Sequence, residues 1–271
     1  MYHKDQSMDP PPRHHALTIA GSDSCGGAGI QADLKTINSL GVEAASVVTA
    51  ITAQNTLGVS QVLSLEPALI LAQLQAVLTD LPISAAKTGM LANTATIKVI
   101  ADELRQHPAL ALVIDPVMVA TSGDRLLDPD AEKLLVSELL PLARLVTPNL
   151  PEARVLTGLD NQASAQQLGE AILGLGCTAV LIKGGHAEGN RVEDLLLTQS
   201  DQHRFSHRRV EESIHGTGCA LSAAITAGLA RGEPLEDAVA AAIEWLQKMI
   251  GRTWRPQAGK LAMLPFSRIC S

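Results

Sequence analysis

Short, continuously apolar runs alternate with segments of helical periodicity along most of this chain, and this alternation restricts the fold more than any other feature. The apolar runs predict buried strands at 16–20, 45–50, 59–65, 83–86, 112–114, 145–146 and 179–182. A half-exposed sheet would instead alternate apolar with polar residues. The pattern therefore predicts an α/β fold in which a mainly parallel central sheet is covered by helices on both faces.

Helices are expected between these strands. Two signals mark them: apolar residues at helical spacing, and capping residues or glycines at the ends. The segments marked in this way are 30–40, 67–81, 97–104, 128–140, 150–157, 163–174 and 239–250. A further helix is expected after the glycines near residue 217, and a strand pair across 194–210. Parallel sheets bind ligands beyond the carboxyl ends of their strands, so the polar segments that follow strands are where chemistry is expected.

Length and composition limit the class of protein. The 271 residues fit one domain at 16–271, preceded by a flexible arm at 1–15 that has no apolar stretch typical of a signal peptide. Polar residues interrupt the uncharged stretch 44–65, so no membrane span is expected and a cytoplasmic protein is predicted. The 28 acidic and 21 basic residues argue against nucleic-acid or membrane-surface binding. The cysteines, at 25, 177, 219 and 270, have the spacing of neither a disulfide framework nor a zinc site.

The run His215-Gly216-Thr217-Gly218-Cys219 is the turn with the clearest chemical meaning. Two glycines flank a threonine and small helix-forming residues follow, so a helix is expected to begin here. Its first amides have no partner within the helix and carry partial positive charge, which suits a phosphate group. The same charge is expected to lower the pKa of the Cys219 thiol. The alternative interpretation is an ordinary glycine turn with a packed cysteine.

Four charged residues follow predicted strands. Asp115 and Glu152 come after neighbouring strands, and two carboxylates placed in this way are suitable oxygen ligands for Mg²⁺. Lys183 follows a third strand beside two glycines, a position suited to a nucleotide phosphate, and Lys87 occupies a similar position. Each residue alone is compatible with a helix cap or a surface charge. Together with the glycine turn they supply the parts of a phosphoryl-transfer site.

Residues 27–32 imitate a dinucleotide-binding fingerprint, because they read G-x-G-x-x-A after a strand and before a helix. An NAD site also requires an acid at the end of the second strand. That strand ends at 52–55 without one, so an NAD-binding oxidoreductase is disfavoured. The sequence also contains no G-x-x-x-x-G-K-[ST] motif, which argues against a Walker-type nucleotidase.

Eight runs of residues, in order between about 16 and 250, resemble the bacterial hydroxymethylpyrimidine/phosphomethylpyrimidine kinases, thiamine-synthesis enzymes of the ribokinase-like superfamily. The runs are 20–23, 26–35, 52–56, 87–91, 115–118, 147–153, 183–186 and 215–219. The resemblance implies ATP as cosubstrate, Mg²⁺, a ribokinase-like fold and a homodimer. It also implies phosphorylation of 4-amino-5-hydroxymethyl-2-methylpyrimidine and then of its monophosphate. A pyridoxal or pyridoxine kinase of the same fold is the alternative.

The resemblance also implies roles for individual positions. Those that match the pyrimidine pocket are Gly21, Asp33, Gln54, Met90 and Val117. Those that match the ATP site are Asp115, Lys183 and Thr217, and the metal side is matched by Glu152 and Asp115. Those that match the catalytic turn are Cys219, Gly216, Thr217 and Gly218. Gln54 suits an aminopyrimidine chemically, because one side-chain amide both donates and accepts hydrogen bonds.

Three residues depart from the family pattern. Thr121 stands where a lysine is usual, which removes a positive charge from a loop expected to close over phosphate. Arg125 replaces a frequent proline nearby, where it could restore that charge, and Ile214 replaces a polar residue. These departures concern the closing loop more than the chemistry. Cys25 is interpreted as a small loop residue and not as a second nucleophile.

Overall fold

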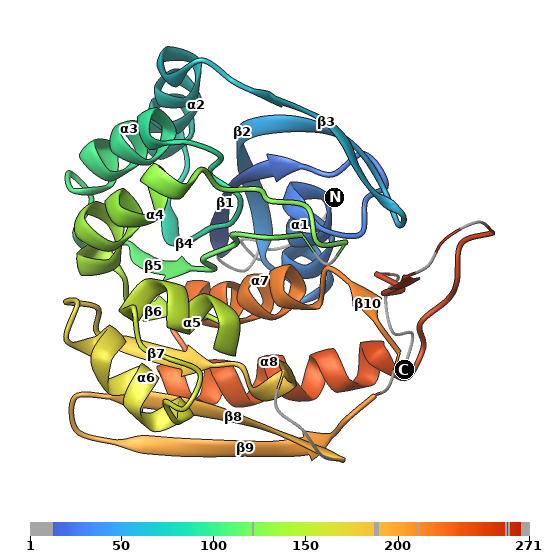
Figure 1. Cartoon of the computed structure of the whole chain (residues 1–271). Helices are drawn as coiled ribbons and strands as arrows, with labels where there is room; N and C mark the ends of the chain where they lie inside the picture. Colours follow the sequence, from blue (N-terminus) through green and yellow to red (C-terminus); the bar gives the residue numbers. More distant parts are fainter. Residues whose placement is uncertain are drawn as a thin grey trace, which may run out of the picture.

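Nine strands form one sheet in the computed structural model, which describes residues 13–120, 122–186, 190–210, 212–257, 259 and 261–266 (Figure 1). The strands are β1 (His15–Ser22), β2 (Glu43–Asn55), β3 (Gly58–Ser64), β4 (Ile83–Thr88), β5 (Ala111–Ile114), β6 (Leu145–Val146), β7 (Ala179–Ile182), β8 (Arg191–Thr198) and β9 (Gln202–Arg208). Their order across the sheet is β3-β2-β1-β4-β5-β6-β7-β8-β9. The strands from β2 to β7 in this order are parallel, while β3, β8 and β9 run antiparallel to their neighbours. The predicted α/β fold with a mainly parallel sheet is confirmed.

Helices cover both faces of this sheet. Along the left of Figure 1 lie α2 (Pro67–Asp80), α3 (Thr94–Leu104), α4 (Pro129–Leu134), α5 (Leu150–Thr157) and α6 (Ala165–Leu173). The helices that pack together against the other face are α1 (Gly29–Ser39), α7 (Thr217–Ala230) and α8 (Leu235–Ile250). Strand β5 explains the continuous apolar runs, because Leu112 and Ile114 enter one core while Val113 enters the other. Successive strand residues point to opposite faces, so a sheet covered twice needs both sets apolar.

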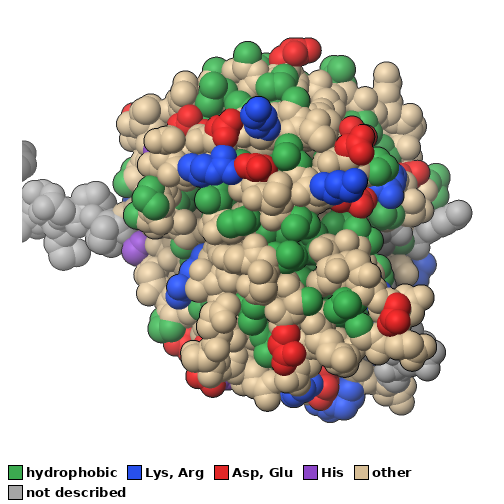
Figure 2. All heavy atoms as spheres, turned by 60° about the vertical axis from the view of Figure 1, so that its left-hand side comes forward, with side chains coloured by type: hydrophobic (Ala, Val, Ile, Leu, Met, Phe, Trp, Pro, Cys, Tyr) green, Lys and Arg blue, Asp and Glu red, His purple; other side chains and the backbone are tan. Residues whose placement is uncertain are grey.

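The surface over α2 to α6 has a mixed character. Figure 2 shows acidic and basic side chains interspersed on this face, with apolar side chains between them. In the part of the chain that the structure describes, no helix is long and apolar enough to span a membrane.

Some elements differ from the sequence prediction. The helix expected over 128–140 is α-helical only in α4, and it continues as a π-helical segment, Leu135–Leu139, and a 3-10 turn, Leu140–Leu142. Pro141 lies in that turn, and its missing amide hydrogen prevents a regular α-helix there. A second sheet pairs β10 (Ile214–His215) with β11 (Ala262–Met263) and was not predicted, because two short strands far apart in the chain carry no periodic signal. The strand pair expected across 194–210 is confirmed as β8 and β9.

A fully buried ion pair links α1 to β4. The Nζ atom of Lys87 lies 3.0 Å and 2.9 Å from the two carboxylate oxygens of Asp33, and the Thr18 hydroxyl donates to the same carboxylate at 2.6 Å. Burial alone would lower the pKa of Lys87, but the charges of Asp33 and Asp115 raise it, so the lysine stays protonated. Asp33 is thus a structural partner of Lys87 in this structure. The family resemblance had implied a place for it in the pyrimidine pocket.

We predict that Lys87→Met lowers the free energy of unfolding by about 3–5 kcal/mol, because the Asp33 carboxylate would remain buried without its partner. The double variant Lys87→Met/Asp33→Leu removes both charges and should recover most of this loss. Denaturant unfolding of the wild type and both variants measures the effect. A double variant no more stable than Lys87→Met would contradict the role of the pair.

Candidate active site

One cavity of about 760 Å³ opens at the carboxyl ends of the parallel strands. This position agrees with the rule that open α/β sheets bind ligands beyond those ends. The predicted site residues that line it are Gly21, Gln54, Met90, Asp115, Val117, Glu152, Lys183, Gly216, Thr217, Gly218 and Cys219. Asp33 is not among the lining residues. The cavity therefore brings together residues from opposite ends of the chain and leaves one predicted pocket residue in the core.

The glycine turn at 216–219 starts α7 at the wall of this cavity. Gly216 has φ +75°, and a Cβ added there would overlap the carbonyl oxygen of Gly27, so only glycine fits. Among the described residues no side chain caps the start of α7. Its first amides are therefore available to a ligand in the cavity, and the helix end favours a negatively charged one.

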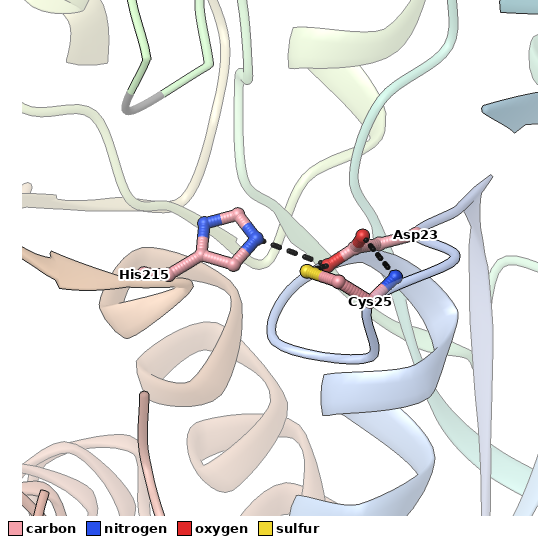
Figure 3. Close-up of side chains that lie close together, drawn as sticks. All are labelled: Asp23, Cys25 and His215. Atoms are coloured by element: carbon pink, nitrogen blue, oxygen red, sulfur yellow. Dashed lines mark hydrogen bonds and ion pairs between the residues drawn. The ribbon is translucent and has the colours of Figure 1, made fainter. Parts of the chain in front are cut away.

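An ion pair joins this turn to the loop that follows β1. His215 Nε2 lies 3.0 Å from Asp23 Oδ2, and both side chains are buried (Figure 3). The same Asp23 carboxylate accepts from the amides of Cys25, Gly27 and Ala28 at 3.0, 3.0 and 2.8 Å. Asp23 thus organises its own loop and holds the turn at the same time. Sequence reasoning gave neither Asp23 nor His215 a role, although both lie in the motifs that carried the resemblance.

The ion pair shifts the pKa values of both partners. Burial alone would lower the pKa of His215, but the hydrogen bond and charge of Asp23, together with Cys25, raise it to about 9. Burial would raise the pKa of Asp23, but its bonds to His215 and to the Ala28 amide lower it. The pair is accordingly charged on both sides near neutral pH.

Cys219 lies in the first turn of α7, half-buried at the cavity wall. Burial raises the pKa of its thiol to about 12, although the charge of Lys87 and a hydrogen bond from the Gly29 amide act in the opposite direction. The expected lowering of this pKa by the helix start is therefore wrong, because desolvation is the larger effect. The nearby carboxylates Asp115 and Asp33 raise the pKa further. The group is a protonated thiol in the ligand-free site.

Asp115, Glu152 and Lys183 form a second charged group, and Lys183 and Asp115 lie next to Gly218 of the turn. Lys183 Nζ lies 3.1 Å from Asp115 Oδ1 and 3.9 Å from Glu152 Oε2. Glu152 also completes a capping box with Asn149 at the start of α5, with bonds of 2.8 and 2.9 Å. Burial raises the pKa of Glu152 to about 7, against the opposing effect of Lys183. Two close carboxylates, one of them hard to ionise without a cation, form a donor set that fits Mg²⁺.

The remaining predicted residues surround the acceptor side. The Thr52 hydroxyl donates to the Ser22 carbonyl at 2.8 Å, and its oxygen lies 3.2 Å from the Gln54 side-chain amide. Gln54 Nε2 lies 3.4 Å from His215 Nε2. Met90 packs tightly over Gly21, where an added Cβ would lie 3.0 Å from its sulfur. Val117 lines the cavity beside them.

The departures from the family pattern have different outcomes. Thr121 lies outside the described residues. Arg125 does not supply a free positive charge, since its guanidinium pairs with Glu132 at 2.7 Å. Ile214 is buried in β10.

An apolar wall of the cavity was missed by sequence analysis. It is formed by Leu221 of α7 and by Ile243, Leu246 and Ile250 of α8, with Gln247 beside them. The helical spacing of these α8 residues predicted a helix and no more, because a stripe that packs in the core and a stripe that lines a cavity have the same pattern. No signal in the sequence separates the two cases.

Comparison with known proteins points to one family. The model of the family described as phosphomethylpyrimidine kinase matches residues 23–263. A hydroxymethylpyrimidine/phosphomethylpyrimidine kinase of Rhizobium meliloti is 52% identical over 249 residues, which cover 90% of this chain and 93% of that protein. The crystal structure of phosphomethylpyrimidine kinase from Clostridium difficile has 41% identity and a TM-score of 0.79, over 88% of this chain and 100% of that one. An ADP complex of Bacillus subtilis pyridoxal kinase has 34% identity and a TM-score of 0.86, over 95% and 99%.

The His215–Asp23 pair predicts a loss of stability in mild alkali. The pKa of His215 in the folded protein, about 9, lies above its ordinary value of 6.5. Protonated His215 therefore contributes its full share to the free energy of unfolding below pH 6.5, and this share is lost as the pH rises through 9. The difference corresponds to roughly 3 kcal/mol. We expect the free energy of unfolding to fall between about pH 7 and pH 9 in the wild type. The fall should be absent in His215→Gln and preserved in His107→Gln, and an equal fall in His215→Gln would contradict the assignment.

Proposed function

We propose that this chain, which belongs to the phosphomethylpyrimidine kinase family, uses the cavity described above to transfer phosphate from ATP to a hydroxymethylpyrimidine. Its activity is that of a hydroxymethylpyrimidine/phosphomethylpyrimidine kinase of thiamine biosynthesis, acting on 4-amino-5-hydroxymethyl-2-methylpyrimidine and then on its monophosphate. The observation that carries the proposal is the open start of α7, which lies between Gln54 on one side and the Asp115–Lys183 pair on the other. Consumption of ATP with the pyrimidine, its monophosphate and pyridoxal, each offered separately, tests it.

Cys219 and the turn before it are proposed as the catalytic centre. The amides of the first turn, with Gly216, Thr217 and Gly218 leaving them uncovered, would stabilise the phosphoryl group in transfer. Phosphoryl transfer passes through a loose transition state that needs little help from a strong base. A protonated Cys219 therefore suffices to orient the acceptor hydroxyl by hydrogen bonding, while the hydroxyl proton passes late in the transfer to an oxygen of the transferred phosphoryl group.

The nucleotide and the metal are assigned to the opposite side. Lys183 and Thr217 are positioned for the phosphate groups, and the Lys183 ammonium now held by Asp115 would pair with a phosphate oxygen when ATP binds. Glu152 and Asp115 are the residues that would hold Mg²⁺, which neutralises phosphate charge when bound. The apolar wall of α8, with Ile243 and Leu246, would cover the adenine ring.

Gln54 is proposed to recognise the ring of the acceptor, together with Gly21, Met90 and Val117. An aminopyrimidine edge offers a ring nitrogen that accepts and an amino group that donates, and one amide satisfies both. Pyridoxal offers a phenolic oxygen and an aldehyde, which match only part of the amide. This difference favours the pyrimidine over pyridoxal, although pyridoxal kinases share the fold.

We also propose a homodimer located in the cytoplasm, as the family resemblance implies. The β2–β3 hairpin exposes Ile51, Leu57, Val62 and Leu63, and a second copy of the chain is the occupant that such an apolar surface would suit in a dimer. The molecular mass in solution tests the dimer.

Cys219→Ala is expected to lower kcat by about 10²-fold, because the hydroxyl of the acceptor would lose its orienting partner. Thermal melting should change little, since the turn is formed by its glycines. Cys177→Ala, which alters a buried cysteine away from the cavity, is the control and should keep its kcat. Near-normal kcat in Cys219→Ala would show that the thiol is only a packing group.

Glu152→Gln is expected to raise the Mg²⁺ concentration for half-maximal activity by about tenfold or more, because it removes a charged ligand while keeping its size. Asp115→Asn should act in the same direction. Titration of activity with Mg²⁺ at fixed ATP measures both variants, and Glu170→Gln on the exposed face of α6 is the control. An unchanged Mg²⁺ dependence in both site variants would remove the metal assignment.

The wild type is expected to prefer hydroxymethylpyrimidine over pyridoxal by at least roughly tenfold in kcat/KM. An unpaired polar group in the pocket costs about 1–3 kcal/mol. Gln54→Leu should lower kcat/KM for the pyrimidine more than kcat/KM for pyridoxal, and so reduce the preference. Gln61→Leu, at an exposed position on the same hairpin, should leave the preference unchanged. Equal efficiency on both rings in the wild type would support the pyridoxal kinase alternative.

A further inference from the structure

Three different metal-ligating side chains converge beside the acceptor pocket. Asp23, Cys25 and His215 offer a carboxylate oxygen, a thiol sulfur and an imidazole nitrogen, and these atoms all lie within 4.8 Å of one another (Figure 3). The first two come from the loop after β1, and the third comes from β10. Cysteine spacing predicted no zinc site, because the third ligand lies far away in the chain and only the fold brings it close.

The spacing of these atoms is close to that of a metal shell. Ligand atoms around a tetrahedral ion with bonds near 2.0–2.3 Å lie about 3.3–3.8 Å apart. His215 Nε2 lies 3.0 Å from Asp23 Oδ2, and Cys25 Sγ lies 3.4 Å from the same oxygen. Small side-chain rotations therefore suffice to admit an ion. The Oδ2 atom at these distances also accepts from the amides of Gly27 and Ala28, so a metal would be bound by Oδ1 of the same carboxylate, which accepts only the Cys25 amide among the bonds of the described residues.

The burial of the three side chains would let a metal ion enter the cluster and then be retained there. Asp23 and His215 are 2% and 3% exposed, whereas Cys25 is half-buried. A cation reaching this cluster would meet the thiol first and would then be enclosed by two buried ligands. Three protein ligands leave a fourth position for water, as in open zinc sites.

The ligand types select the kind of cation. Thiolate and imidazole suit zinc and similar transition metals, whereas Mg²⁺ prefers oxygen donors such as Asp115 and Glu152. We propose that Asp23, Cys25 and His215 bind Zn²⁺ or a similar thiophilic divalent cation, and that this binding inhibits the kinase. Coordination releases the thiol proton and any proton on His215 Nε2.

The inhibitory effect follows from the contacts that the cation would replace. It would take over the Asp23–His215 bond, which joins the loop after β1 to the turn at 216–219. It would also displace Gln54 Nε2, which lies 3.4 Å from His215 Nε2. The KM for the pyrimidine should therefore rise more than the KM for ATP. This consequence rests on the proposed function, whereas the binding itself does not.

Binding is tested on the full chain without nucleotide, since ATP itself captures zinc. Titration with Co²⁺ should produce a sulfur-to-cobalt charge-transfer absorption at one equivalent, and calorimetry should give a micromolar or tighter Kd for Zn²⁺. Cys25→Ser should abolish the absorption and weaken Zn²⁺ binding by at least about tenfold. The matched control Cys177→Ser should keep the cobalt absorption and the affinity for Zn²⁺, and so should Cys219→Ser. Millimolar Mg²⁺ should displace neither metal.

Three results would overturn the site: no absorption in the wild type, no Zn²⁺ binding, or Cys25→Ser binding Zn²⁺ as tightly as the wild type. Activity supplies a separate test, because Cys25→Ser should keep basal kcat and KM while losing the rise in pyrimidine KM that free Zn²⁺ causes in the wild type. Binding without that rise would overturn the inhibitory role and leave the site standing. Absence of any kinase activity would contradict the proposed function and not the metal site.

Discussion

The ion pair between Asp23 and His215 is the interaction on which the geometry of the site depends. The loop after β1 and the turn before α7 come from opposite ends of the chain, and the pair joins them at 3.0 Å. Steric fit reinforces it, because a Cβ at Gly216 would overlap the Gly27 carbonyl. The acceptor loop and the phosphate-binding helix end therefore form one unit, which fixes where a hydroxyl can meet a phosphoryl group.

The charges beneath the cavity are balanced in two separate groups. Lys87 is fully neutralised by Asp33 in the core, whereas Lys183 divides its charge between Asp115 at 3.1 Å and Glu152 at 3.9 Å. The first pair is sealed from solvent, so it acts as a fixed structural element. The second faces the cavity, where an incoming phosphate and a cation can exchange partners with it. Lys87 also lines the cavity, but its ammonium is held by Asp33 alone, whereas Lys183 is shared between two carboxylates, although the two lysines looked alike in the sequence.

Sequence reasoning succeeded where the signal was local. Continuous apolar runs located the strands because both faces of the sheet are covered. The glycines at 216 and 218 located the start of α7, where only glycine fits at 216 beside Gly27. It failed where partners are distant in the chain. The carboxyl group of Asp33 is used by Lys87, and the thiol of Cys219 is governed by burial more than by the helix end. Neither effect has a short-range pattern.

The protonation of His215 also determines what Gln54 offers to a substrate. Because its pKa is raised to about 9, the His215 Nε2 proton is present near neutral pH and is donated to Asp23. That nitrogen then cannot accept a bond from Gln54 Nε2, although the two atoms are 3.4 Å apart. The Thr52 hydroxyl donates its one proton to the Ser22 carbonyl at 2.8 Å, so its oxygen, 3.2 Å from the Gln54 side-chain amide, is free to accept an amide hydrogen. One amide hydrogen of Gln54 is thus left for a ring nitrogen, and its side-chain oxygen is left for an amino group. The same ion pair that joins the two loops therefore also keeps the recognition amide free for an aminopyrimidine edge.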